Sequence, residues 1–356
     1  MTPVKPLIVV VGGYLGAGKT TLLLRAAALL EKSGYRVALI TNDQGSDLVD
    51  TRLAAAATPH NEEVTGGCLC CRFSDFIDAA DRLRASEPHV ILAEPVGSCI
   101  DIAATVLRPL AEYYRDRYRL APFTVLVEPQ RARELLAPDA DPHQAYLFTN
   151  QLAEADIVCF SRADLSVDFP ELPSGCAFRL SGITGEGVEE WLAQVLADGS
   201  LSGARPLQNV DYGRYATAEA ALGWMNWHAT LLLNRALGPA QVAGPFLDSL
   251  DDALSRKGIA IAHLKLFDQT PAGHIRASLC RNKEEPMVDG MLDASPAREH
   301  DLVLNLRACG SPEQLQAALQ EATRQLPGAA TVLHFESFRP APPQPQHRVG
   351  GGSQNH

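Results

Sequence analysis

The stretch Leu7-Ile-Val-Val-Val-Gly-Gly13-Tyr-Leu-Gly-Ala-Gly18-Lys19-Thr20 decides the fold of this chain. Its five apolar residues, Leu7 to Val11, predict a buried β-strand, and the residues from Gly13 to Thr20 match the pattern G-x-x-x-x-G-K-T. A helix-like stretch begins at about Lys19, so the strand, glycine-rich loop and helix that this pattern requires are all present. The sequence therefore predicts a loop that holds phosphate groups at the N-terminus of a helix.

Each residue type in this loop has a physical role in phosphate binding. Glycines allow tight turns that aim backbone N–H groups inward, and the helix N-terminus adds positive potential. The Lys19 ammonium reaches the β- and γ-phosphates, and the Thr20 hydroxyl binds Mg²⁺. We expect the nucleotide to contact Gly13, Gly16, Ala17, Gly18, Lys19, Thr20 and Thr21.

The first half of the chain alternates short apolar runs with helical stretches, which predicts parallel strands joined by crossover helices. The runs are continuously apolar, as expected where both faces of a parallel sheet are covered. The expected strands are 7–11, 36–41, 90–93, 124–127 and 157–160, with helices from 19, near 76–85 and near 188–197. The predicted fold class is α/β, a three-layer P-loop NTPase domain with a mostly parallel sheet.

A Gly/Ser/Pro-rich connector at 198–206 suggests a domain boundary. We expect a nucleotide-binding domain over 1–200 and a smaller α+β domain with a mostly antiparallel sheet over 207–338. The segment 339–356 is rich in Pro, Gly and Gln and poor in apolar residues, which predicts disorder.

Carboxylates follow two of the expected strands, at the edge where open α/β sheets bind ligands. Asp43 follows the strand ending near Thr41, and Glu94 begins Glu-Pro-Val-Gly97. Such groups hold Mg²⁺, orient the attacking water or cap the next helix. We assign Lys19, Asp43 and Glu94 to catalysis, Thr20, Asp43 and Glu94 to Mg²⁺, and the Gly97 N–H to the γ-phosphate.

Two later loops are candidates for base recognition. Ser161-Arg-Ala-Asp164 stands where many GTPases carry N-K-x-D, and Asp164 retains the carboxylate that accepts hydrogen bonds from guanine. The segment 180–187, which contains Ser181, resembles the loop that packs beside the base. We expect Ser161, Asp164 and Ser181 to contact a guanine nucleotide, the alternative for either segment being an ordinary surface turn.

Three of the eight cysteines crowd into Gly66-Gly-Cys68-Leu-Cys70-Cys71, and the other five are scattered. Three thiolates within four residues suit a borderline-soft ion such as Zn²⁺ or Co²⁺ and leave one coordination position open, as in a site that loads and releases metal. Water, Glu63 or a group that the sequence does not identify could fill that position. Packing cysteines or a regulatory disulfide or sulfenate site are the alternatives.

The charge balance narrows the range of partners. With 42 acidic and 31 basic residues the net charge is -11, which argues against nucleic acid and anionic membrane surfaces. The scattered cysteines indicate a reducing compartment, and the N-terminal apolar run is too short for a signal peptide or a membrane span. A cytoplasmic protein is the expectation.

The chain resembles the CobW-type GTPases, which are metal-handling P-loop proteins related to HypB and UreG. Four segments together carry this resemblance: the glycine-rich loop, Thr41-Asn-Asp-Gln, Gly66-Gly-Cys-Leu-Cys-Cys and Glu94-Pro-Val-Gly. This resemblance covers most of residues 5–195. It implies hydrolysis of GTP, binding of Zn²⁺ or Co²⁺ by Cys68, Cys70 and Cys71, and delivery of the metal to a client protein. We expect turnover to be slow without a partner, because the phosphate loops encode no obvious arginine finger. Assembly into a nucleotide- or metal-dependent homo-oligomer is a further candidate.

Two other functions are compatible with the same residues. In a thiol-based metal or redox sensor, the nucleotide would be structural and no turnover would occur. A small-molecule kinase built on the same loop would transfer phosphate to an acceptor, but it leaves the cysteine cluster without a use. Metal-stimulated phosphate release would exclude the sensor.

Overall fold

A computed structural model of the chain describes residues 5–45, 49–50, 53–54, 58–197, 205–207 and 209–350. The chain divides into two compact units, one made of residues 1–44, 50–218 and 342–356 and the other of residues 45–49 and 219–341. The division near residue 218 lies within helix α8 (Tyr212–Ala220). Most of the connector predicted at 198–206 lies outside the described residues.

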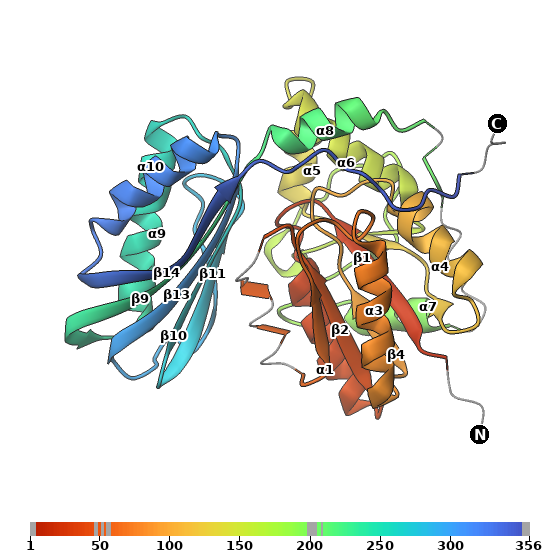
Figure 1. Ribbon diagram of the computed structural model, residues 1–356, viewed down its shortest axis with the longest axis horizontal. Coiled ribbons are helices and arrows are strands. Elements are labelled where there is room, and N and C mark those ends of the chain that lie inside the picture. The colour runs from red at the N-terminus through yellow and green to blue at the C-terminus, as the bar shows by residue number, and fades with distance from the viewer. Residues whose placement is uncertain are drawn as a thin grey trace. The chain divides into compact units, whose positions relative to one another are not determined.

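The first unit is built on a parallel sheet in the order β3-β2-β4-β1-β6-β7-β8, with β5 paired to β1 (Figure 1). Every pair of neighbouring strands in it is parallel. The strands are β1 (Leu7–Gly13), β2 (Val37–Asn42), β3 (Asn61–Val64), β4 (Val90–Ala93), β5 (Arg119–Leu120), β6 (Thr124–Val127), β7 (Ile157–Phe160) and β8 (Phe178–Arg179). The predicted α/β fold with a mostly parallel sheet is therefore confirmed.

Successive residues of a strand point to opposite faces of the sheet, so both faces of this sheet carry apolar side chains. Helices cover these two faces. Val9 packs with Ala26 of α1 and Trp191 of α7 in one buried cluster. Ile8 points to the other face and is equally inaccessible to solvent. Among the described residues, the helices of this unit are α1 (Lys19–Lys32), α3 (Phe73–Leu83), α4 (Arg108–Tyr113), α5 (Pro129–Leu136), α6 (Pro142–Glu154), α7 (Val188–Leu196) and α8, with short helical turns η1 (Arg84–Ser86), η2 (Ala103–Leu107) and η3 (Ala163–Leu165).

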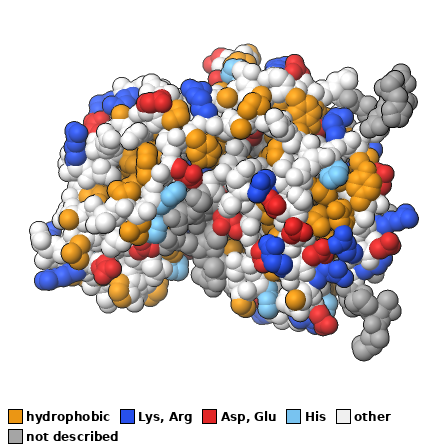
Figure 2. Space-filling model, viewed as in Figure 1, with side chains coloured by type: hydrophobic (Ala, Val, Ile, Leu, Met, Phe, Trp, Pro, Cys, Tyr) orange, Lys and Arg blue, Asp and Glu red, His pale blue; other side chains and the backbone are white. Residues whose placement is uncertain are grey.

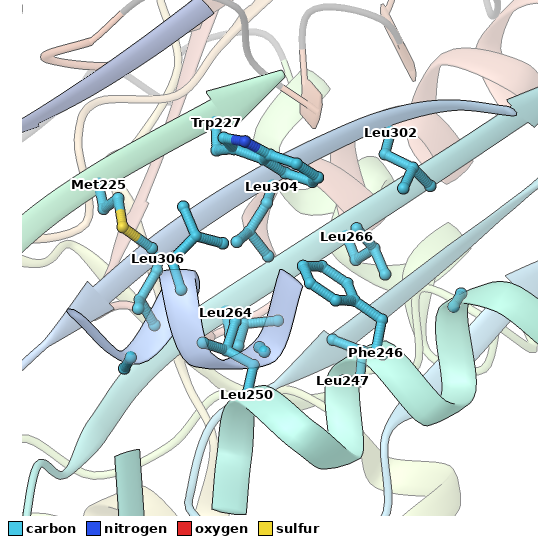
Figure 3. Packing of buried hydrophobic residues seen from close by; sticks show 14 of the residues in the cluster. Met225, Trp227, Phe246, Leu247, Leu250, Leu264, Leu266, Leu302, Leu304 and Leu306 are labelled. Carbon is cyan, nitrogen blue, oxygen red and sulfur yellow. The ribbon is translucent and has the colours of Figure 1, made fainter. Parts of the chain in front are cut away.

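The second unit is an antiparallel sheet in the order β12-β11-β10-β13-β9-β14. Its core lies between the sheet and the helices, where Trp227 and Leu304 from the strands face Phe246 and Leu250 from α9 (Figure 3). Its elements are β9 (Gly223–Leu237), α9 (Pro239–Arg256), β10 (Ile261–Thr270), β11 (Gly273–Leu279), β12 (Met287–Gly290), β13 (Ala297–Ala308), α10 (Pro312–Thr323) and β14 (Gly328–Phe338). This is the α+β architecture that the sequence predicted.

The predicted disorder of the segment after Arg339 is wrong for the residues that the structure describes. From Pro342 to Gly350 the chain belongs to the first unit, where it passes near α4 as the dark blue trace of Figure 1. The Arg348 Nε lies 2.8 Å from Asp101 Oδ2, and the Val349 N–H donates to the Ala104 carbonyl. This segment is held by backbone and polar side-chain groups, so its lack of apolar residues did not reveal its order. Residues 351–356 lie outside the described part.

The surface carries charges of both signs. Figure 2 shows Lys and Arg side chains interspersed with Asp and Glu over the visible face. Within the described ranges, no helix has both the length and the apolar composition needed to cross a membrane.

Candidate nucleotide and metal site

The glycine-rich loop curls between β1 and α1. Gly18 stands directly before α1 with φ +87°, a left-handed conformation that glycine adopts without strain. Inside the loop, the Ala17 N–H donates to the Tyr14 carbonyl, and the Lys19 ammonium donates to the Gly13 carbonyl at 2.9 Å. The loop is thus a closed turn at the N-terminus of a helix, a geometry suited to binding anions.

Thr20 and Glu94 meet at the edge of the sheet where β1 and β4 end. The Thr20 hydroxyl lies 2.9 and 3.0 Å from the two carboxylate oxygens of Glu94, and both side chains are buried. Asp43 follows β2, and its carboxylate accepts a hydrogen bond from the Gln44 N–H at 2.7 Å. Hydroxyl and carboxylate oxygens are ligands that Mg²⁺ prefers, so the Thr20–Glu94 pair fits this ion chemically.

The loop that follows β4 packs directly against the glycine-rich loop. A Cβ atom at Gly97 would lie 3.1 Å from the backbone N and Cα of Leu15. Only a residue without a side chain allows this approach without a shift of one loop. The loop of Gly97 and the glycine-rich loop are therefore in close contact.

The two candidate base-recognition loops are adjacent. The Ala163 N–H donates to the Leu180 carbonyl at 3.0 Å, which joins the turn of Asp164 to the segment of Ser181. The Arg162 guanidinium donates to the Gly16 carbonyl at 3.3 Å. Ser161 and Ser181 are buried, and Asp164 is exposed. The structure thus brings these sequence segments to the glycine-rich loop.

The cysteine cluster forms one turn that leads into α3. The Cys71 N–H donates to the Cys68 carbonyl at 2.9 Å, and the three sulfur atoms lie within 4.8 Å of one another. Cys68 Sγ is 2.7 Å from Cys70 Sγ and 3.5 Å from Cys71 Sγ, and Cys70 Sγ is 3.6 Å from Cys71 Sγ. Sulfur atoms on one tetrahedral zinc ion lie about 3.8 Å apart, because each is about 2.3 Å from the metal. The two separations that involve Cys71 are close to that value, whereas the separation between Cys68 and Cys70 is shorter. Glu63, a candidate fourth ligand, is not in this group.

Hydrogen bonds among the thiols distinguish the three cysteines electrostatically. Those from Cys70 and Cys71 hold the pKa of Cys68 well below its usual range despite burial. The bond to Cys68 raises the pKa of Cys70 and raises that of Cys71 to about 12. A lowered pKa favours the thiolate form of Cys68, and thiolates are the form that binds metal. All eight cysteines are free of disulfide bonds.

Asn42, the last residue of β2, connects the cysteine turn to the loop after β4. Its side-chain oxygen accepts hydrogen bonds from the Leu69 N–H at 3.0 Å and the Val96 N–H at 3.2 Å. Its amide group donates to the carbonyls of Val64 and Gly67. Leu69 lies within the cysteine turn, and Val96 adjoins Gly97 in the loop after β4. The buried Asn42 side chain therefore joins the cysteine turn to that loop.

The C-terminal segment lies over the cysteine turn. The Gln344 N–H donates to Cys71 Sγ at 3.1 Å, and the Gln346 N–H donates to the Cys70 carbonyl at 3.0 Å. The Gln346 side chain also pairs with Ser74, and the His347 ring packs edge-on against Phe73. We refer to residues 342–350 as the C-terminal strap.

The sequence interpretation missed two parts of this site: Asn42 and the C-terminal strap. Asn42 immediately precedes Asp43 at the end of the same strand, which was the available signal, whereas nothing in the composition of the strap pointed to the cysteines.

These features define a P-loop domain that carries a cluster of three thiols. Residues 7–174 match the family model of the CobW/HypB/UreG nucleotide-binding domain.

Curated relatives and solved structures were also compared with the chain. It is 41% identical over 68 residues to the zinc chaperone YjiA of Escherichia coli K12, covering 19% of this chain and 21% of that protein. It is 28% identical over 160 residues to the zinc chaperone YeiR of the same strain, covering 43% and 45%. The matches thus span less than half of these relatives. The solved Zn(II)-bound YjiA GTPase of E. coli is 15% identical, with a TM-score of 0.32 over 90% of this chain and 99% of that one.

Proposed function

We propose that this protein is a GTP-binding and GTP-hydrolysing metallochaperone, which binds Zn²⁺ or Co²⁺ at Cys68, Cys70 and Cys71 and delivers it to a client protein. The observation that carries the proposal is the Asn42 side chain, which joins the cysteine turn to the loop bearing Glu94 and Gly97. Two ligand sites that share one buried polar connection can influence each other's affinity.

Nucleotide binding is assigned to the glycine-rich loop, from Gly13 to Thr21. Its backbone N–H groups and the helix N-terminus hold the phosphates, and the Lys19 ammonium exchanges the Gly13 carbonyl for phosphate oxygens. The hydroxyl of Thr20 and the carboxylates of Asp43 and Glu94 are suited to hold Mg²⁺, which neutralises charge that develops on the phosphates. Glu94, the buried partner of Thr20, is also placed to orient the attacking water.

The same loops account for coupling between nucleotide and metal. A γ-phosphate that accepts a hydrogen bond from the Gly97 N–H would fix the loop after β4, and Val96 would transmit this constraint to Leu69 through Asn42. Hydrolysis removes the γ-phosphate contact and relaxes the loop, as in order–disorder switches generally. The thiols would then hold metal more weakly, which permits delivery.

We assign guanine as the base and the cytoplasm as the compartment. The Asp164 carboxylate is exposed on the turn beside Ser161 and Ser181, where it can accept hydrogen bonds from guanine N1 and its 2-amino group. Eight cysteines without a disulfide bond suit a reducing compartment. The partner is a client metalloprotein, and a nucleotide- or metal-dependent homo-oligomer is a further assembly to test.

The metal dependence of GTP hydrolysis tests this proposal against the thiol-sensor alternative. We expect Zn²⁺ or Co²⁺ to change the GTPase rate of the wild type and to leave unchanged that of a variant in which Cys68, Cys70 and Cys71 are replaced by Ser. A Cys176→Ser variant, altered at an exposed cysteine outside the cluster, is the control. Equal rates with and without metal in all three proteins would remove the metallochaperone proposal, and reversible thiol oxidation without hydrolysis would favour the sensor.

A further inference from the structure

The segment 45–49 follows Asp43 closely in the chain but belongs to the second unit. The chain leaves the first unit after Gln44 and returns to it at Asp50. Gly45 is the second residue after Asp43, whose carboxylate is a proposed ligand of Mg²⁺. Whatever holds this segment in the second unit therefore acts on the backbone directly beside that carboxylate.

A row of polar side chains crosses three strands of the second sheet. Asn305 of β13 lies opposite Asn226 of β9, which lies opposite Glu336 of β14. The Asn305 amide donates to the Asn226 side-chain oxygen at 3.0 Å, and the Asn226 amide donates to Glu336 Oε1 at 2.7 Å. The Arg307 guanidinium donates to the same Asn226 oxygen at 2.8 Å. Asn226 is 0% exposed and Asn305 is 6% exposed, so both are buried polar groups with fixed partners. We refer to Asn226, Asn305 and Glu336 as the polar row.

Two described residues of the segment contact the polar row. The Val49 N–H donates to Asn305 Oδ1 at 2.9 Å, and Val49 is inaccessible to solvent. A Cβ atom at Gly45 would overlap the Asn226 amide nitrogen and would lie 2.5 Å from Glu336 Oε1. Because hydrogen bonds hold the Asn226 amide on both sides, it cannot move aside without losing them. The close approach of the backbone therefore requires glycine at this position.

We propose that the polar row holds the chain directly after Asp43 and so positions the Asp43 carboxylate for Mg²⁺ and nucleotide, which makes Asn305 and Asn226 positioning residues for GTP hydrolysis. This inference rests on the GTPase function proposed above and extends it to the second unit. The Asp43 N–H donates to the Val64 carbonyl at 3.2 Å, which holds the backbone before the carboxylate. The contacts of Gly45 hold the backbone after it. A side chain on a backbone that is held on both sides loses less conformational freedom when it binds a ligand.

The chain between Asp43 and the polar row is too short to absorb a displacement. Gln44 is the single residue between Asp43 and Gly45, and consecutive Cα atoms are about 3.8 Å apart. A shift of Gly45 therefore moves Asp43, and a misplacement of about 1 Å at a reacting site can lower a rate about 100-fold. The second unit thus acts on the proposed reaction through the backbone of residues 43–45.

Nucleotide affinity with and without Mg²⁺ tests this inference without relying on hydrolysis. Binding of a fluorescent non-hydrolysable GTP analogue is measured in excess Mg²⁺ and in EDTA, and the ratio of the two affinities is compared between proteins. We expect Asn305→Ala and Gly45→Ala to lower this ratio about 5-fold or more relative to the wild type, and to leave the affinity in EDTA within about 2-fold. Asn234→Ala, altered at an exposed asparagine of β9, is the matched control and should keep the ratio of the wild type.

Rescue by a conservative variant separates positioning from a loss of folding. Asn305→Asp keeps the oxygen that accepts the Val49 N–H, and its ratio should return to within about 2-fold of the wild type. Gly45 lies outside the helices and strands, so Gly45→Ala tests the same point if circular dichroism shows that Asn305→Ala is unfolded.

Ratios equal to that of the wild type in folded Asn305→Ala and Gly45→Ala would overturn the positioning role of the polar row. In that case GTP hydrolysis by the wild type would leave the proposed function standing. Failure of the wild type to bind and hydrolyse GTP would overturn both.

Discussion

The side-chain oxygen of Asn42 accepts a hydrogen bond from the Leu69 N–H, in the middle of the cysteine turn. The same oxygen accepts a second hydrogen bond from the Val96 N–H, in the loop that carries Glu94 and Gly97. A single buried amide therefore joins the cysteine turn to the loop after β4.

Replacing Asn42 should separate metal binding from nucleotide binding. We expect Asn42→Ala to reduce the effect of a GTP analogue on Co²⁺ affinity from about 10-fold to less than about 2-fold, because no group then joins Leu69 to Val96. The variant should also unfold more easily, by about 2–4 kcal/mol, since backbone groups lose their partners. Asn42→Asp keeps both acceptor contacts and should retain more coupling. Full coupling in Asn42→Ala, measured by anaerobic Co²⁺ titration, would contradict this role.

Thr20 should be required for Mg²⁺-dependent hydrolysis. We expect Thr20→Val, which keeps the shape of the side chain and removes its hydroxyl, to lower the GTPase rate about 100-fold or more. Thr20→Ser retains the hydroxyl and should stay within about 5-fold of the wild type. Steady-state phosphate release at several Mg²⁺ concentrations checks this, and equal rates for the Val and Ser variants would exclude a role for the hydroxyl.

The C-terminal strap should shield Cys71. Removing residues 342–356 deletes the Gln344 N–H that donates to Cys71 Sγ and the Gln346 contacts beside it. We expect faster alkylation of Cys71 and faster release of Zn²⁺ to a chelator, each by about 5-fold or more, since local opening becomes easier. Removing only 351–356 is the matched control and should change neither rate. Identical rates in the two truncated proteins would mean that the strap does not protect the thiol.

The buried carboxyl of Glu154 should make the first unit less stable as the pH rises. Burial raises the pKa of Glu154 well above its usual value, and one carboxylate oxygen has no hydrogen-bond partner. The folded state therefore favours the protonated carboxyl group of Glu154. The contribution of this group to the free energy of unfolding is complete below its unfolded-state pKa of about 4.3, and it is lost as the pH rises through its folded-state pKa.

Urea unfolding between pH 4.5 and 8 measures this effect. Between pH 4.5 and pH 8 the free energy of unfolding of Glu154→Gln should not show this decrease. Over the same range it should rise relative to that of the wild type by at least about 1 kcal/mol. Glu112→Gln, altered at an exposed side chain, should follow the wild type. Parallel curves for Glu154→Gln and the wild type would show that Glu154 does not titrate in this range.

The sequence predicted the parts of the fold that apolar patterning and glycine-rich turns determine. The strand from Leu7, the helix from Lys19 and the antiparallel second sheet follow from local patterns that tertiary contacts reinforce. The nearness of Thr20 to Glu94 also follows, because adjacent parallel strands end at the same edge.

Other contacts could not be predicted, since they depend on how distant segments meet. Asn42 links Leu69 to Val96 only because the cysteine turn and the loop after β4 both approach the end of β2, and no spacing in the sequence encodes that approach. The strap docks through backbone N–H groups of Gln344 and Gln346, which every residue except proline possesses. Composition therefore gave no indication of its order.

The most direct test of coupling between nucleotide and metal is a pair of reciprocal titrations on the wild type under anaerobic conditions. Co²⁺ affinity is measured with a non-hydrolysable GTP analogue and with GDP, and the affinity for each nucleotide is measured with and without Co²⁺. Linkage predicts that the analogue tightens Co²⁺ binding relative to GDP by about 5-fold or more, and that Co²⁺ increases the preference for the analogue over GDP by the same factor. Co²⁺ affinities that are equal with the two nucleotides would contradict the account.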